Sequence, residues 1–131
     1  MEIVRNLINT DLGLIKQFRD DTTSMLHDLD YDDDFIFKIR LILDELIINS
    51  YKHGNNKEFD KIIEVMLCFD GDLAVIKVKD EGDGIIYSKE RDLMSDHGRG
   101  IQLVYTLADS LYVKDNTIVV MINTNEEDED I

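Results

Sequence analysis

An apolar run with helical spacing over residues 35–54 constrains the fold of this 131-residue chain more than any other segment. Its hydrophobic side chains cover a surface wide enough to be enclosed by other elements, and they are Phe35, Ile36, Ile39, Ile42, Leu43, Leu46 and Ile47. The acidic residues 32–34 can cap such a helix and complement its dipole, and Gly54-Asn55-Asn56 can end it. The run therefore predicts a central core helix.

The segments around this helix predict one α+β domain. In chain order we expect a strand over residues 2–8, a helix over 12–29, the core helix, strands over 62–69 and 73–80, a helix at 101–108, and strands over 110–114 and 117–122. Asp11 can cap the first helix, whose apolar side comprises Leu12, Ile15, Phe18 and Leu26. Asp70-Gly71-Asp72 suits a hairpin turn between the two middle strands.

Composition fits a single domain, which we expect over residues 1–125. The chain is 44% hydrophobic and has no proline, so it can bury one core and shows no linker. Its lone Cys68 excludes an internal disulfide, and we expect a buried structural thiol in a reducing, cytoplasmic setting. There is no apolar run of membrane-spanning length and no secretory signal pattern, so we expect no membrane association.

The formal net charge of −15 argues against nucleic acid as a partner, because nucleic-acid-binding proteins usually need a basic face. For residues 126–131 we expect a disordered, solubilising acidic tail, with a docking tail as the alternative. A nucleotide site on so acidic a chain would depend on magnesium, backbone amides and a few local cations.

Glu45 and Asn49 are the first candidate site residues. They lie four residues apart within the core helix, which puts both side chains on one helical face. A carboxylate can accept a proton or orient a nucleophile, and a carboxamide oxygen is a ligand suited to magnesium. Taken alone, such a pair is more typical of a solvated helix face.

Asp80 begins the second candidate motif, Asp80-Glu81-Gly82-Asp83-Gly84, at the end of a predicted strand. The two-residue strand period puts Asp80 on the same face as Ile76 and Val78, so its carboxylate should enter a cleft lined by helices, where it needs a partner. Glycines let the backbone approach a planar ligand, and an adenine amine is a suitable donor to the carboxylate. A plain acidic turn is the alternative interpretation.

The third motif, Gly98-Arg99-Gly100-Ile101, opens the last predicted helix. Unpaired amides at a helix start can bind phosphate oxygens, and glycine removes the side chains that would block them. Arg99 adds a local cation. A helix start without any ligand is an equally ordinary interpretation of this motif when it is taken alone.

The three motifs together, in this order and on these elements, resemble the GHKL ATPase superfamily. The resemblance covers about residues 35–122. Its N-box matches Glu45-Leu46-Ile47-Ile48-Asn49-Ser50-Tyr51-Lys52-His53-Gly54, and its two glycine boxes match Asp80-Glu81-Gly82-Asp83-Gly84 and Gly98-Arg99-Gly100-Ile101. Where relatives often follow the first glycine box with an aromatic-acid-proline sequence, this chain has Ile85-Ile86-Tyr87.

The short chain and the His-Gly ending of the N-box look most like the bacterial anti-sigma-factor serine/threonine kinases. The resemblance implies a Bergerat or histidine-kinase-like ATPase fold: a two-layer α/β (α+β) sandwich with a mixed, mainly antiparallel sheet and three helices on one face. It also implies ATP and Mg²⁺ as cofactors, with residues 85–97 as the ATP lid.

The resemblance assigns a role to each motif residue. Glu45 would be the catalytic general base or the group that orients the nucleophile, Asn49 the magnesium ligand and Asp80 the acceptor for the adenine amine. The residues that would shape the adenine pocket or let phosphate approach are Gly82, Gly84, Gly98, Arg99 and Gly100. Thr117 would support Asp80 through water.

By the same resemblance, the protein would phosphorylate a STAS-type anti-sigma antagonist, sequester a sigma factor and form a homodimer. The alternative is a nucleotide-gated protein-binding module of the same fold with little or no kinase activity. A third possibility is an interaction domain that binds no ligand.

Overall fold

The structure is a computed structural model that describes residues 1–82 and 96–123, with the backbone alone for residues 96–101. Its elements along the chain are β1 (Glu2–Asn9), α1 (Leu12–Asp28), α2 (Asp33–Asn49), the short π-helix η1 (Ser50–Gly54), β2 (Ile62–Asp70), β3 (Leu73–Lys79), α4 (Asp96–Leu107), β4 (Ser110–Lys114) and β5 (Thr117–Asn123). The described elements follow the predicted order.

Local sequence explains where the first two helices begin. Asp11 Oδ2 accepts a hydrogen bond from the Leu14 N–H at 3.0 Å, and Asp32 Oδ1 accepts one from the Phe35 N–H at 2.8 Å. Each carboxylate thereby satisfies an amide that the helix itself leaves unpaired, which confirms the predicted caps. These caps set the starts of α1 and α2.

The predicted helix over residues 35–54 ends in a different geometry from the one expected. Regular α-helix stops at Asn49, and η1 continues it as a wider turn. The Asn55 N–H closes this turn by donating to the Ser50 carbonyl oxygen at 2.7 Å, a bond that spans five residues instead of four.

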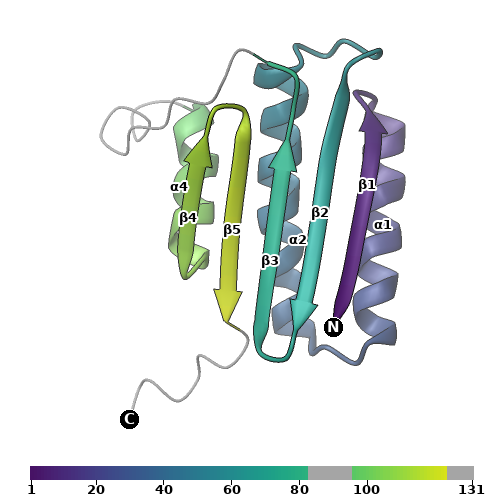
Figure 1. The fold of residues 1–131 in the computed structure, drawn as a ribbon, viewed down its shortest axis with the longest axis vertical. Coiled ribbons are helices and arrows are strands. Elements are labelled where there is room, and N and C mark those ends of the chain that lie inside the picture. The colour runs from purple at the N-terminus through teal and green to yellow at the C-terminus, as the bar shows by residue number, and fades with distance from the viewer. Residues whose placement is uncertain (83–95, 124–131) are drawn as a thin grey trace.

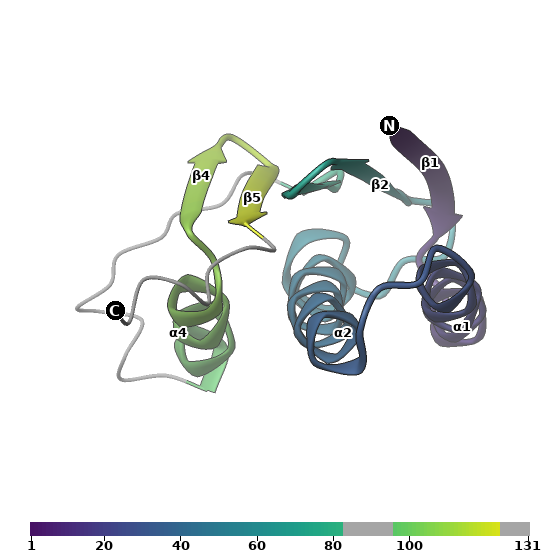
Figure 2. The same cartoon turned by 90° about the horizontal axis from the view of Figure 1, so that it is seen from below.

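The sheet has the strand order β1-β2-β3-β5-β4, and each of these four strand pairs is antiparallel (Figure 1). The helices α1, α2 and α4 cover one face of the sheet, with α2 between the other two (Figure 2). This arrangement confirms the predicted two-layer α+β sandwich. The expected mixed sheet is wholly antiparallel over the strands that the structure describes.

The core lies between the two layers. All seven apolar side chains predicted for the core helix are buried, with exposed fractions of 8% or less. They face side chains of the three middle strands that point inward and alternate along each strand with outward-pointing ones. The inward side chains are Ile63, Val65, Leu67, Phe69, Ala74, Ile76, Val78, Ile118, Val120 and Ile122. The helical and strand periods read from the sequence therefore determine the core.

Two predictions of burial are wrong. Leu12, expected on the apolar side of α1, is 54% exposed because it is the first residue of the helix, before the buried stripe that begins at Ile15. Cys68 is only partly buried. Its neighbours Leu67 and Phe69 point into the core, so the strand period turns Cys68 to the open face of the sheet.

Several chain segments meet at one end of the sheet (Figure 1). Antiparallel pairing brings the end of β1, the start of β2 and the end of β3 together there. The chain returns to the same end at η1, after α1 and α2 have crossed the sheet and come back. The start of α4 also lies there, because α4 runs back to reach the start of β4 at the opposite end.

In the described ranges, no helix has the length and apolarity needed to cross a lipid bilayer.

Candidate functional site

Asp80 lies directly after β3 and is the one buried ionisable side chain among the described residues, with 4% of its surface exposed. It follows the inward-facing residues Ile76 and Val78, as the strand period predicted. Burying a carboxylate costs free energy unless partners compensate, so a buried acid at the edge of a core is a candidate for function.

The two oxygens of Asp80 have different surroundings. Oδ1 accepts a hydrogen bond from the Gly82 N–H at 2.9 Å, which closes a tight turn at the strand end. No residue in the described ranges donates a hydrogen bond to Oδ2. One oxygen therefore fixes the direction of the carboxylate, and the other can accept a hydrogen bond from a ligand.

The backbone around Asp80 is held from two sides. On the sheet side, the Asp80 N–H donates to the Asn116 carbonyl oxygen at 3.2 Å, and the Asn116 side chain donates back to the Asp80 carbonyl oxygen. On the helix side, the Glu81 N–H donates to Asn55 Oδ1 at 2.7 Å. These bonds connect the strand end to both neighbouring segments.

Gly54 and Gly82 let η1 and the end of β3 touch. A Cβ atom built on Gly54 would lie 2.1 Å from Asp80 Oδ2, and one built on Gly82 would lie 2.5 Å from the Gly54 carbonyl oxygen. Cβ atoms in proteins do not approach other heavy atoms so closely, and neither neighbouring atom is the free end of a long side chain. The sequence predicted an open backbone at Gly82, but for Gly54 it predicted a helix end and the end of the N-box, not a contact with Asp80.

Glu45 and Asn49 are both partly buried on α2, one helical turn apart. Asn49 is the last residue of α2, and Gly54, which contacts Asp80, follows it five residues later. The turn η1 therefore links Asn49 to the segment that packs against the Asp80 carboxylate, although Asn49 and Asp80 are distant in sequence.

The second glycine box lies in the first turns of α4, so its predicted place at a helix start is confirmed for Gly98, Arg99 and Gly100. Gly84 and most of the expected lid, residues 85–95, lie outside the described residues.

Among the described residues, Thr117 makes no direct hydrogen bond with Asp80. The register pairs Thr117 with Lys79, whose side chain is exposed, whereas Ile118 next to it points into the core. The neighbouring Asn116 makes the direct contacts with Asp80 instead. The water-mediated support expected from Thr117 stays a prediction.

The roles of Asn55 and Asn116 and the close approach of Gly54 were not predicted from the sequence. The sequence did indicate that such partners should exist, because a buried Asp80 needs groups that compensate its charge. The sequence did not say which residues these are, because Gly54-Asn55 is also ordinary chemistry for the end of a helix.

The donor atoms available to a magnesium ion are few. Among the described residues, no three His, Cys, Asp or Glu side chains are grouped so as to hold a metal. An ion at Asn49 would therefore need phosphate oxygens and water to complete its ligands, which fits the way magnesium is usually bound with nucleotides.

The described residues therefore form an α+β domain in which helices cover one face of an antiparallel sheet (Figure 2), with the buried Asp80 packed against Gly54 at one sheet end. The family model described as the histidine kinase-like ATPase domain matches residues 8–123. The chain belongs to this family, which agrees with the resemblance to the GHKL superfamily and implies use of a nucleotide. No curated protein matches the chain significantly.

Proposed function

We propose that this protein is an anti-sigma regulatory factor and an Mg-ATP-dependent serine/threonine kinase. Its substrate would be a serine of a STAS-type anti-sigma antagonist, and its second partner a sigma factor that it sequesters as a homodimer. The Asp80 carboxylate carries the ATP-binding part of this proposal, because it is buried yet keeps one oxygen for a ligand donor. The kinase subgroup and its partners rest on the sequence resemblance.

In this proposal Asp80 accepts a hydrogen bond from the adenine amine, and Gly82 and Gly84 leave room for the base. The Asn49 carboxamide would hold a magnesium ion, which would neutralise phosphate charge. Glu45, one turn earlier on α2, orients the serine hydroxyl and takes its proton. Such positioning and electrostatic stabilisation are the main requirements of phosphoryl transfer.

The phosphate groups are bound at the start of α4. Its first amides have no partner within the helix, and Gly98 and Gly100 carry no side chains that would obstruct a phosphate. Arg99 supplies a cation in a chain whose overall charge is unfavourable for nucleotide binding. Thr117 supports Asp80 through water.

Replacing Asp80 with asparagine should weaken ATP binding by roughly 10- to 100-fold, because the amide loses the charge of the acceptor and presents donors that face the adenine amine. Titration calorimetry with ATP and magnesium measures this change. Asp70→Asn is the matched control, since Asp70 is exposed at the other end of the β2–β3 hairpin. Wild-type protein without magnesium-dependent ATP affinity would favour the ligand-free interaction domain instead.

The partner assignment is tested with purified proteins encoded next to this gene. We expect transfer of labelled phosphate from ATP to a serine of the STAS protein, and a nucleotide-dependent complex with the sigma factor. Light scattering reports whether that complex contains two copies of this chain. Complex formation without phosphoryl transfer would favour the nucleotide-gated binding module.

A further inference from the structure

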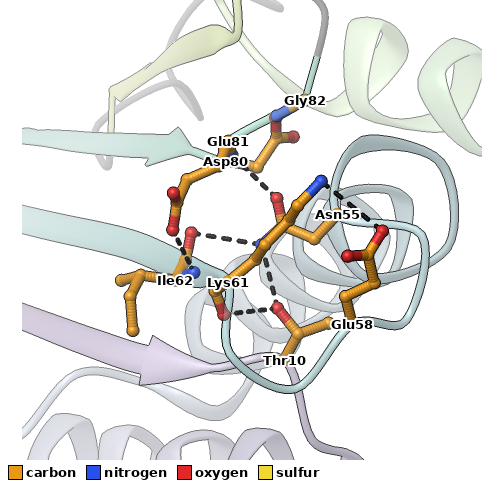
Figure 3. A network of polar contacts seen from close by, with 8 residues as sticks. All are labelled: Thr10, Asn55, Glu58, Lys61, Ile62, Asp80, Glu81 and Gly82. Carbon is orange, nitrogen blue, oxygen red and sulfur yellow. Dashed lines mark hydrogen bonds and ion pairs between the residues drawn. The ribbon is translucent and has the colours of Figure 1, made fainter.

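The buried side chain of Asn55 is the centre of a polar network that joins four segments (Figure 3). Its Nδ2 donates to Thr10 Oγ1 at 2.9 Å, just after β1, and to the Ile62 carbonyl oxygen at 3.1 Å, at the start of β2. Its Oδ1 accepts from the Glu81 N–H at 2.7 Å, next to Asp80. With 0% of its surface exposed, Asn55 cannot exchange these partners for water.

The network leaves Asn55 only one orientation. The Thr10 hydroxyl donates its proton to the Lys61 carbonyl oxygen at 2.7 Å, so toward Asn55 it can only accept. The Ile62 carbonyl is also an acceptor, and both therefore require the NH₂ group of the carboxamide. Its oxygen is then fixed toward the Glu81 N–H.

Glu81 is held a second time through its side chain. Its Oε2 accepts from the Ile62 N–H at 2.5 Å, so the residue after Asp80 is bonded both to Asn55, directly after η1, and to the first residue of β2. The next residue, Gly82, donates its N–H to Asp80 Oδ1. Among the described residues, Asn55 is the one that hydrogen-bonds to this turn from the helix side of the sheet.

We infer that Asn55 is a positioning residue for base recognition. It contacts no part of a bound nucleotide itself; by holding the Glu81 amide it fixes the turn that aims Asp80. Because Asn55 directly follows η1, it also links the end of α2, which carries Glu45 and Asn49, to Asp80, the residue proposed to recognise the base. This inference rests on the proposed function, in which Asp80 accepts the adenine amine.

The ability of the protein to distinguish ATP from an analogue without the adenine amine tests whether Asn55 positions Asp80 or only fills the core. Purine riboside triphosphate lacks the amine of adenine and is otherwise the same ligand, so the ratio of its Kd to that of ATP measures recognition by Asp80. Wild type should favour ATP by ~10-fold or more, and Asp80→Asn should abolish this preference. A variant that only lowers stability should weaken both ligands alike.

Three variants make the comparison specific to one hydrogen bond. Asn55→Ala removes the acceptor of the Glu81 N–H and should reduce the preference for ATP to ~2-fold or less. Asn55→Asp keeps an oxygen facing the Glu81 N–H and should keep the preference, although it loses the donors to Thr10 and Ile62. Thr10→Val removes one acceptor of Asn55 Nδ2 but leaves the bond from the Glu81 N–H intact, so this variant should also keep the preference for ATP.

In the double variant, Asn55→Ala should cause little further loss of ATP affinity once Asp80 is already asparagine, because both changes remove the same interaction. If Asn55→Ala does not fold, Asn55→Ser provides the same test, since its shorter side chain cannot reach the Glu81 amide. Unchanged discrimination in the alanine or serine variant overturns the positioning role. Unchanged discrimination in Asp80→Asn instead overturns the proposed function, and with it the inference.

Discussion

Replacing Glu45 with alanine is expected to slow phosphoryl transfer by roughly 100- to 10,000-fold, the range that a general base contributes, while ATP binding stays close to wild type. Glu45 lies one turn before Asn49 on α2, on the face that the proposed function turns toward the phosphates. Its removal takes away the group that receives the proton of the serine hydroxyl. It leaves intact the Asp80 contacts that recognise the base.

The measurement uses labelled ATP, magnesium and the STAS protein, with nucleotide affinity determined in parallel. Asp44→Ala is the matched control, because Asp44 is the preceding residue on α2 but lies 3.5 Å from Arg19 Nη1 of α1, in an ion pair. It should transfer phosphate at the wild-type rate. Full activity in Glu45→Ala would remove Glu45 from the catalytic role. Wild-type protein that binds ATP without transferring phosphate would identify a binding module.

Replacing Gly54 with alanine is expected to lower both ATP affinity and stability. The added Cβ would lie 2.1 Å from Asp80 Oδ2, the oxygen that the proposed function assigns to adenine. Asp80 cannot easily move aside, because Asn116 holds its backbone on one side and Asn55 holds Glu81 on the other. We expect a loss of ATP affinity of roughly 10- to 100-fold and a loss of about 1–3 kcal/mol in the free energy of unfolding.

Calorimetric titration and denaturant unfolding measure these two losses. Gly13→Ala is the control for ATP affinity, because a Cβ there would meet only Asp11 Oδ2, the cap of α1, at 3.2 Å, and would not touch Asp80. Its ATP affinity should equal that of wild type, and the higher helix propensity of alanine offsets the strain on the cap. Normal ATP affinity in Gly54→Ala would show that the carboxylate can be displaced without affecting the nucleotide.

Much of the fold could be predicted because it depends on short-range periodicity. The apolar positions of α2 repeat at helical spacing, and Ile76, Val78 and Asp80 share a face because a strand alternates every two residues. The carboxylates of Asp11 and Asp32 mark helix starts by local hydrogen bonds. These features need no knowledge of the tertiary arrangement.

The rest of the site could not be predicted because it depends on which segments meet in space. Asn55 was assigned to the end of a helix, and its bonds to Thr10 and Glu81 join residues that are 45 and 26 positions away in the chain. Likewise, Gly54 matters because η1 touches the end of β3, an approach that no local pattern encodes. Burial of Asp80 was foreseen, but its partners were not.

The π-turn η1 also acts as a spacer of fixed length. It inserts a wider turn between Asn49 and Asn55, and each residue added to or removed from a helix rotates everything beyond it by roughly 100°. A chain one residue shorter here would turn the Asn55 side chain away from the strand end. The number of residues between these two asparagines is therefore constrained as well as their identities, and an insertion or deletion there should be more harmful than a substitution at any of these positions except Gly54.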